Sequence, residues 1–411
     1  MNYELFIAKR IITGKQYKSS ISSPIIKIAI IAIALGIVIM MIAIATGVGL
    51  QQKIHQKLSG FNGHIQISNF DSNNSEITLE PISKNQDFYP KFTNVSGIRN
   101  VQVFATKPGI IRTETDFEGI IFKGVSNDYN WNFFNEYLIE GIVPNYTKKV
   151  SNEVLISEEI SKRMSLNIND EFNMLFVKKD PAKAPWIRVV KAVGIYNSGF
   201  QDFDKNYIIG DIQHIQKMNR WREDEVGGFE IFLNNFNDIE EKSNEIYEQT
   251  ASTLNSESIV EKYPEIFEWI RVFLNNTYLI IAIIILIAGI NMITALLVLI
   301  LERTQMVGIL KSLGSTNVSI RKVFLYNAGY LILRGLFWGN LIGLGILLLQ
   351  KYGGFISLDP ETYYVNTVPI YIDFGYIIAL NIGTLVLCLL MLIIPSIVIS
   401  KISPVKSIKF E

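Results

Sequence analysis

Four long apolar runs constrain what this chain can fold into. They cover Ile25–Leu50, Tyr278–Leu301, Val323–Gln350 and Ile377–Ser400. A helix needs roughly 20 residues to cross a hydrocarbon core about 30 Å thick, and each run is long enough. A single run could be a buried helix of a soluble protein. Four together predict an α-helical membrane protein with four transmembrane helices, at residues 25–50, 273–301, 323–350 and 377–400.

The distribution of charge supports this interpretation. The 38 basic and 38 acidic residues cancel overall, but residues 51–271 hold 24 basic against 32 acidic side chains. The remaining flanks are therefore net basic, and their basic residues lie beside the apolar runs. A nucleic-acid-binding protein would concentrate basic charge on a soluble domain, so no nucleic-acid partner is expected. The single cysteine, Cys388, excludes a disulfide or Cys-based zinc site within one chain.

Basic residues in the short flanks predict the orientation of the spans. Lys and Arg gather in residues 1–24, 302–322 and 401–411. The loop 351–376 carries instead Lys351 against Asp359, Glu361 and Asp373. We therefore expect both termini and the 302–322 segment in the cytoplasm, and the 351–376 loop outside.

The N-terminal segment is predicted to be an uncleaved membrane anchor. Its apolar run is too long for a signal peptide, and no Ala-x-Ala cleavage site closes it. Ahead of the run, apolar residues interleave with Lys9 and Arg10, which suits an amphipathic helix along the inner membrane surface. A solvated tail is the alternative.

A domain-sized stretch, residues 51–272, separates the first two spans. Short runs with strand character occur at 101–104, 119–125, 153–156, 172–177, 187–195 and 229–233, and runs with helical spacing at 157–164 and 238–254. The pattern predicts a large external α+β domain of one or two lobes, inserted between transmembrane helices 1 and 2.

This domain offers little catalytic chemistry. His55, His64 and His214 lack metal-ligand spacing, and the adjacent Glu158 and Glu159 would point apart on a helix. The His-Glu-x-x-His and Gly-x-Ser-x-Gly motifs are missing from the sequence. We predict no catalytic residue, no metal site and no enzyme activity.

One loop of the domain could bind a partner. Residues 178–186 lie between two strand-like runs and read as a hairpin tip stiffened by prolines. The candidate partner-binding residues are Pro181, Lys183, Pro185 and Trp186. A plain solvated turn explains the loop equally well.

The segment after the second span has the features of a docking helix. Met306, Ile309, Leu310 and Leu313 recur at i, i+3, i+4 and i+7, which predicts one apolar face, and Gly314 suits a helix stop. Ser315 or Thr316 can cap the next helix. A helix this short cannot form a domain of its own, so its apolar face needs a partner.

Small and charged residues mark the third span. Gly335, Gly339 and Gly343 recur every four positions, about 6 Å apart, and permit close packing of another span. Arg334 lies about eleven residues into the same span, where charge is costly. It could contact substrate or a lipid headgroup, or it could be a paired structural charge.

Specific motifs carry a family resemblance. Glu302-Arg303 followed by Val307–Gly314 resembles the signature after the second span of FtsX-like ABC transporter permeases, a group that includes the MacB type. The run Leu333–Gly343, the loop Leu358–Tyr364, the ending from Pro395 to Ile408, and Tyr196–Phe200 with Asp204 are similar to the LolC/LolE lipoprotein-releasing system transmembrane proteins.

The resemblance implies a fold, partners and a location. It implies an FtsX-like permease domain at about 273–405 and a MacB-like core with a second lobe in the external domain. It also implies a homodimer or heterodimer of permeases in the bacterial inner membrane, driven by a separate LolD-like ATPase that binds ATP and Mg. This chain has no Gly-x-x-x-x-Gly-Lys-[Ser/Thr] phosphate loop of its own and is expected to hold no cofactor.

The resemblance also implies roles for particular residues. Coupling to the ATPase would involve Glu302, Arg303, Met306, Val307, Gly308, Ile309, Leu310, Lys311 and Gly314. Lipoproteins would leave the outer leaflet of the membrane for a periplasmic LolA-like carrier, held by a hook at the 178–186 loop.

Two other functions compete with lipoprotein release. A MacB-like or FtsX-like mechanotransmission permease would drive efflux or activate a cell-wall hydrolase on the same scaffold. A membrane-anchored sensor or adhesion module would need no ATPase. The apolar docking segment argues against the sensor, and the 358–364 loop and the C-terminal motif favour lipoprotein release over mechanotransmission.

Overall fold

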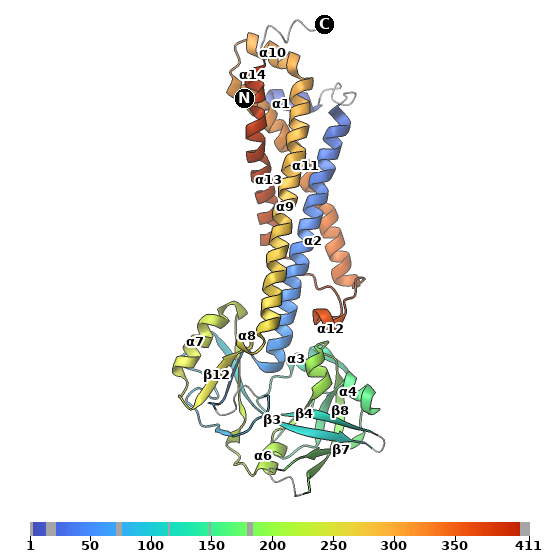
Figure 1. Ribbon diagram of the computed structural model, residues 1–411, viewed down its shortest axis with the longest axis vertical. Coiled ribbons are helices and arrows are strands. Elements are labelled where there is room, and N and C mark those ends of the chain that lie inside the picture. Colours follow the sequence, from blue (N-terminus) through green and yellow to red (C-terminus); the bar gives the residue numbers. More distant parts are fainter. Residues whose placement is uncertain are drawn as a thin grey trace. The chain divides into compact units, whose positions relative to one another are not determined.

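The computed structural model describes residues 3–13, 22–70, 76–113, 116–147, 149–178 and 184–402. The chain divides into two compact units, shown as ribbons in Figure 1. The helical unit comprises Met1–Leu50, Ile270–Ile356 and Val368–Glu411. The sheet unit comprises Gln51–Trp269 and Ser357–Thr367.

Long helices dominate the helical unit. They are α1 (Tyr3–Thr13), α2 (Ser22–Asn62), α9 (Pro264–Glu302), α10 (Thr304–Ser312), α11 (Asn317–Gly353), α13 (Phe374–Ser396) and α14 (Val398–Lys401). Within the described residues, four helical segments are long and apolar enough to cross a membrane: Pro24–Asn62, Pro264–Glu302, Asn317–Gly353 and Phe374–Lys401. Each contains one of the predicted runs.

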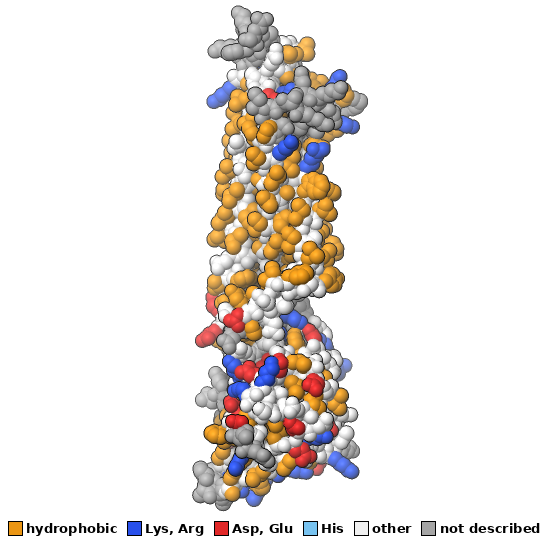
Figure 2. Space-filling view, turned by 90° about the vertical axis from the view of Figure 1, so that its right-hand side faces the viewer, with side chains coloured by type: hydrophobic (Ala, Val, Ile, Leu, Met, Phe, Trp, Pro, Cys, Tyr) orange, Lys and Arg blue, Asp and Glu red, His pale blue; other side chains and the backbone are white. Residues whose placement is uncertain are grey.

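The surface of this unit suits a hydrocarbon solvent. Large apolar side chains on all four long helices are half exposed, among them Leu35, Leu286, Leu341 and Leu390. Figure 2 shows hydrophobic side chains covering one side of the helices, with Lys and Arg gathered at the end that carries α1 and α10. A soluble bundle would place polar residues on these outer faces.

The four helices share one buried core. Most of its residues come from α2, α9, α11 and α13, and include Ile37, Met292, Phe324 and Leu392. Asn340 of α11 and Asn381 of α13 exchange two side-chain hydrogen bonds, at 2.6 and 3.0 Å. Paired amides of this kind hold helices together where no water competes.

The predicted N-terminal helix is present as α1, which packs on the first turns of α11. Ala8 and Ile11 are buried against Val323, and Ile7 and Met306 cover the contact. The apolar residues of α1 therefore divide between this contact and an outer face that exposes Leu5 and Phe6.

The described part of the sheet unit contains twelve strands and several short helices. The strands are β1 (Ile65–Asn69), β2 (Ile82–Ser83), β3 (Ile98–Arg112), β4 (Phe117–Val125), β5 (Leu138–Gly141), β6 (Glu153–Ser157), β7 (Glu171–Phe176), β8 (Trp186–Tyr196), β9 (Tyr207–Asp211), β10 (Glu225–Val226), β11 (Gly228–Leu233) and β12 (Leu254–Ser258). The helices are α3 (Asn132–Tyr137), α4 (Glu158–Met164), α5 (Gln201–Asn206), α6 (Gln213–Asn219), α7 (Ile239–Gln249), α8 (Ile259–Lys262) and α12 (Pro360–Tyr363).

The strand β3 joins two lobes of this unit. Its first half pairs with β11, in an open arrangement with order β12-β1-β11-β3. Its second half pairs with β4 and β7, and the strands β3, β4, β9, β6, β8 and β7 close into a ring. Closure leaves these six strands without a free edge. The predicted α+β class is confirmed, with two lobes.

The predicted elements of this domain are recovered with one correction. All six strand-like runs fall on strands, and the 157–164 run forms α4. The predicted helix at 238–254 is wrong at its end, because α7 stops at Gln249 and Leu254 begins β12. Thr250 bends its hydroxyl back to the Ile246 carbonyl at 2.6 Å, and the following residues pair with β1.

Candidate coupling and partner-binding sites

The segment after α9 forms a separate short helix, α10. Gly314 follows it with a φ of +91°, a conformation that favours glycine and turns the chain away from the helix. The Thr316 hydroxyl then accepts a hydrogen bond from the Ser319 amide at 3.3 Å and caps α11. The sequence left Ser315 and Thr316 open as caps, and the structure selects Thr316.

Burial divides the apolar residues of α10 between two sides. Val307 and Gly308 are buried, and Met306 and Leu310 pack against the core of the helical unit. Ile309 is 46% exposed and Leu313 is 77% exposed. The face predicted to dock a partner thus narrows to Ile309 and Leu313, while the others hold α10 on its own unit.

Lys311 has an internal partner at the end of α14. Its ammonium donates to the carbonyls of Ile399 and Ile402, at 2.8 Å each. A cation is stabilising there because the last carbonyls of a helix lack partners within the helix. Arg321 donates to the Ser400 hydroxyl nearby. Both contacts tie the α10 region to the C-terminal segment.

The glycine stripe of α11 faces α2. A methyl group built on Gly335 would lie 2.7 Å from Ile33 Cγ2, and one on Gly339 would lie 2.8 Å from the Ala34 carbonyl oxygen. At Gly343 the nearest atom is the Met41 sulfur at 3.1 Å. The missing side chains therefore allow the two helix backbones to approach closely.

In the sheet unit, Asp204 organises a tight turn. Its carboxylate accepts hydrogen bonds from the Ser198 hydroxyl at 2.7 Å and from the Gly199 amide at 3.0 Å. Gly199 has a φ of +63°, and a methyl group there would lie 2.9 Å from the Lys57 ammonium. Only glycine fits this position without strain.

The Asp204 turn meets two distant segments of the same unit, in what we name the turn contact (Lys57, Gly199, Phe200, Asp204 and Tyr364). Phe200 stacks on the Tyr364 ring with centroids 5.1 Å apart. The Lys57 ammonium donates to the Tyr364 carbonyl at 3.0 Å. The last turns of α2 and the 357–367 loop are therefore both fastened to this turn.

Burial shifts the titration of both charged residues at the turn contact. Desolvation raises the pKa of Asp204 to about 6, although its hydrogen bonds and Lys57 oppose the rise. Desolvation likewise lowers the pKa of Lys57 to about 8, against the charge of Asp204. Both pKa values are thereby brought closer to neutral pH.

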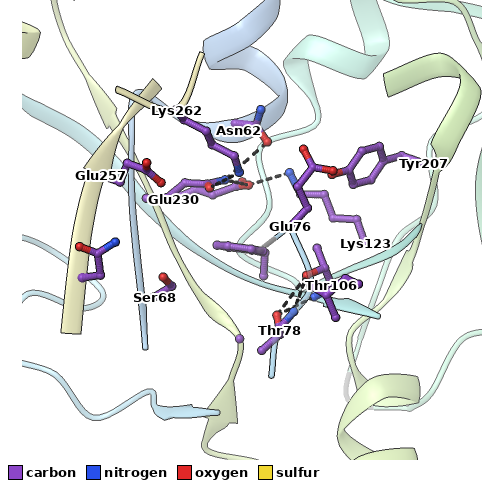
Figure 3. A pocket seen from close by; sticks show the side chains of 15 residues that line it. Asn62, Ser68, Glu76, Thr78, Thr106, Lys123, Tyr207, Glu230, Glu257 and Lys262 are labelled. Atoms are coloured by element: carbon purple, nitrogen blue, oxygen red, sulfur yellow. Dashed lines mark hydrogen bonds and ion pairs between the residues drawn. The ribbon is translucent and has the colours of Figure 1, made fainter. Parts of the chain in front are cut away.

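A second polar cluster lies where the two lobes join, around a small cavity (Figure 3). Lys123 of β4 and Glu230 of β11 form an ion pair at 2.6 Å, with 2% and 0% of their side chains exposed. Gln102 of β3 donates to the same carboxylate at 2.9 Å. Lys123 also donates to the Phe61 carbonyl at the end of α2, so the pair joins three strands and a helix.

The loop predicted as a hook connects β7 and β8 in the sequence. Pro181 and Lys183 lie outside the described residues, while Pro185 is exposed and Trp186 begins β8 opposite Phe176. The Lys178 ammonium lies 4.5 Å from the Trp186 ring centroid, a cation–π distance. The described part of the hairpin thus carries a basic and an aromatic group side by side.

Exposed apolar residues lie on β7 and β8 of this hairpin and on the neighbouring strand β3. Ile110, Leu175 and Ile187 are opposite one another on β3, β7 and β8. Ile110 is 38% exposed, Ile187 is 57% exposed, and Val189 is half exposed two residues further along β8. We name Ile110, Leu175, Ile187 and Val189 the hairpin patch. A clustered apolar surface on a folded domain is typical of a protein-binding site.

The three histidines make structural contacts. His55 stacks on Phe236 with centroids 3.8 Å apart, and His64 accepts a hydrogen bond from the Leu233 amide at 3.1 Å. His214 lies 2.8 Å from the Ser151 carbonyl. Burial lowers the pKa of His55 and of His64 to about 4, so both rings are neutral at physiological pH.

Two family models together match most of the sequence. A MacB-like periplasmic core domain matches residues 28–255, which is more than half of the chain. The C-terminal domain of FtsX-like permeases matches residues 278–404. The chain is an FtsX-like permease with a MacB-like periplasmic core.

Curated relatives of this permease match it nearly end to end. The lipoprotein-releasing system transmembrane protein LolC of Haemophilus influenzae is 22% identical, with 93% of each chain covered. LolC of Buchnera aphidicola subsp. Schizaphis graminum is 23% identical, with 92% of each covered. LolE of Haemophilus influenzae is 19% identical, with 98% of each covered.

Among solved structures, the periplasmic region of MacB from Actinobacillus actinomycetemcomitans matches with 14% identity and a TM-score of 0.33. The match covers 50% of the permease and 94% of that chain.

Sequence reasoning missed the turn contact of the permease. Both of its motifs, Tyr196–Phe200 with Asp204 and Leu358–Tyr364, stood out in the sequence, but nothing in their spacing linked them. No sequence pattern around Lys57 indicated that it takes part in this contact. The position of Lys57 near the end of α2 becomes informative only in the folded protein, where it lies beside the Gly199 turn and the Tyr364 loop.

Proposed function

We propose that this permease is the membrane subunit of an ABC transporter that extracts lipoproteins from the outer leaflet of the bacterial inner membrane. In this proposal residues 51–272 form the periplasmic domain inserted between the first two spans, and both termini are cytoplasmic. A second permease, identical or related, completes the transporter. The observation that carries the proposal is the match to LolC and LolE relatives over more than nine tenths of the chain.

ATP hydrolysis would be supplied by a separate LolD-like ATPase carrying ATP and Mg. The exposed pair Ile309 and Leu313 supports α10 as its docking element. The contact of Lys311 with the end of α14 holds α10 rigidly, and a rigid element transmits displacement better than a loosely attached one.

Movement of α2 would reach the periplasmic domain through its last turns. Phe61 is fully buried and stacks on Phe203 at 4.0 Å, and Lys57 contributes to the turn contact. Both residues are packed within the sheet unit. Because protein interiors are closely packed, a displacement of this helix end would move the sheet unit with it.

The lipoprotein would then pass to a periplasmic LolA-like carrier. The hairpin patch and the neighbouring Lys178 and Trp186 support this step, because they offer apolar area beside a basic group. Apolar and aromatic residues of this kind dominate the energetics of protein interfaces.

Mechanotransmission of the MacB or FtsX kind is a second candidate function. The match of the MacB-like periplasmic core model over residues 28–255 supports it. Under this alternative the permease would act on a periplasmic partner without extracting a lipid-anchored protein.

Release from proteoliposomes distinguishes the two functions. We expect the permease, its ATPase and a second permease to transfer a triacylated lipoprotein to soluble carrier only when ATP and Mg are present. Leu313→Glu should reduce ATPase recovery and release about tenfold or more, because it places a charge on the docking face. Leu79→Glu makes the same change at an exposed leucine of the sheet unit and should have no effect. ATP hydrolysis without any lipoprotein release would favour mechanotransmission.

A further inference from the structure

Arg334 lies on an outward, apolar face of α11. Its neighbours on this face, Leu333, Phe337 and Trp338, are each more than half exposed. Together with Tyr330 and with Ile30 of α2, they line a shallow hollow around the arginine. Since α11 is a membrane-spanning helix, this face meets lipid, where an exposed guanidinium is costly unless an anion neutralises it.

The side chain of Arg334 points toward one end of the helix. Its guanidinium carbon lies 4.6 Å from the ring centroid of Tyr330, one turn toward the N-terminus of α11. Long side chains on helices lean in this direction, and cations in membranes extend toward the nearer interface. The N-terminal end of α11 is also where α1 packs. The charge of Arg334 is therefore directed toward the leaflet that contains α1.

A second hollow adjoins the first and shares Tyr330 and Leu333 with it. It has a volume of about 570 Å³ and lies between α1, α11 and α13. Its walls are apolar, with Leu325, Leu385 and Leu389 among them, and Lys9 of α1 borders it. None of the described residues that line either hollow is acidic.

We propose that these adjoining hollows bind an anionic phospholipid of the leaflet that contains α1. The acyl chain would lie along the leucines between α11 and α13, and the phosphate would sit between the two cations, Lys9 and Arg334. Tyr326 and Tyr330 line the path between them and can donate hydrogen bonds to headgroup oxygens. Two cations beside an apolar groove whose described lining residues include no acidic side chain match the chemistry of an anionic lipid.

This lipid differs from the proposed cargo of the transporter. The proposed lipoprotein enters from the outer leaflet, whereas this groove belongs to the leaflet of α1 and the cytoplasmic side in the proposed orientation. By bridging α1 and α11, the lipid would hold α1 in place beside Met306, which packs against both α1 and the helical core. The inference stands independently of the transported substrate.

Native mass spectrometry of the purified full-length permease tests the proposal. The detergent-solubilised protein is titrated with phosphatidylglycerol and, separately, with phosphatidylcholine. We expect Arg334→Gln to weaken phosphatidylglycerol binding about fivefold, the effect of one cation near a membrane surface, without changing phosphatidylcholine binding. Arg334→Lys should retain the preference for the anionic lipid.

Two further variants keep the test decisive. Lys351→Gln removes a cation from the other end of α11 and should leave both affinities unchanged. Lys9→Gln should weaken phosphatidylglycerol binding severalfold, and it decides the question if Arg334→Gln does not fold. Unchanged phosphatidylglycerol affinity in both Lys9→Gln and the folded Arg334→Gln protein would overturn the proposal.

A second copy of the permease is the competing occupant of this face. With Cys388 replaced by alanine, Trp338→Cys would then form a disulfide between two chains in native membranes. The lipid proposal expects no such cross-link, and a high yield of it would overturn the lipid assignment.

Discussion

The buried ion pair of Lys123 and Glu230 connects strands β4 and β11 of the periplasmic core. Each charge is removed from water, and the pair is stabilised only while both partners and the hydrogen bond from Gln102 are present. The pair sits between the two lobes and also binds the carbonyl at the end of α2. The pair therefore links both lobes to the last turn of α2.

We predict that Lys123→Met destabilises the permease by about 3–5 kcal/mol, because it removes the ion-pair partner of the buried Glu230 carboxylate. The double variant Lys123→Met with Glu230→Gln should be less destabilised than Lys123→Met alone. Thermal unfolding in detergent, followed by tryptophan fluorescence, measures both. Losses that simply add in the double variant would show that the two side chains are not coupled.

The raised pKa of Asp204 predicts that the free energy of unfolding depends on pH. Its pKa is raised to about 6 in the folded protein from an ordinary value of 3.8, so between these values the folded state binds more protons than the unfolded state. Stability from this group is fully present below about pH 4 and falls as the pH rises through 6. The change amounts to roughly 1–3 kcal/mol.

Comparison with Asp204→Asn isolates this effect from other titrating groups. Between pH 7 and pH 4.5 the wild type should gain thermal stability relative to the variant. A difference between the two proteins that stays constant over this range would contradict the assignment.

At the scale of elements, the packing of α2 on α11 depends on the glycine stripe. We predict that Gly339→Ala costs about 1–3 kcal/mol, because the new methyl group would lie 2.8 Å from the Ala34 backbone oxygen, which cannot rotate away. Gly345→Ala is a matched control on the same helix, with no atom within 4 Å of the added carbon. Gly345→Ala should be neutral or slightly stabilising, since alanine favours a helix. Equal melting temperatures for both variants would mean that α2 does not pack closely on this stripe.

At the scale of the whole molecule, the proposed orientation predicts which residues face each side. In a Cys388→Ala background, Ser312→Cys on α10 should be protected from a membrane-impermeant thiol reagent in intact spheroplasts. Asn244→Cys on α7 should react. Both positions are exposed on the folded chain, so accessibility reports the side of the membrane rather than burial. Labelling of Ser312→Cys before lysis would contradict the proposed cytoplasmic location of α10.

The elements of this permease could be predicted from sequence because their signals are local. A membrane helix satisfies its own backbone hydrogen bonds, so apolar length alone identifies it, and the strands of the core showed themselves by runs of β-forming residues. The α10 segment was also recognisable from its motif. Its division into a buried side at Val307 and an exposed side at Leu313 was not, because periodicity shows that a face is apolar and not what covers it.

The sequence by itself determined that this chain has four membrane helices, a large α+β domain and an FtsX-like motif after the second span. Only the tertiary structure decided which residues meet. Lys311 binds carbonyls about 90 positions further along the chain, and Gly339 faces α2 rather than α9 or α13. Lys57 donates to the Tyr364 carbonyl beside the turn that Asp204 organises. Such pairings depend on the shape and charge of surfaces formed by distant segments. These surfaces exist only after the chain has folded, so no pattern within one segment encodes them.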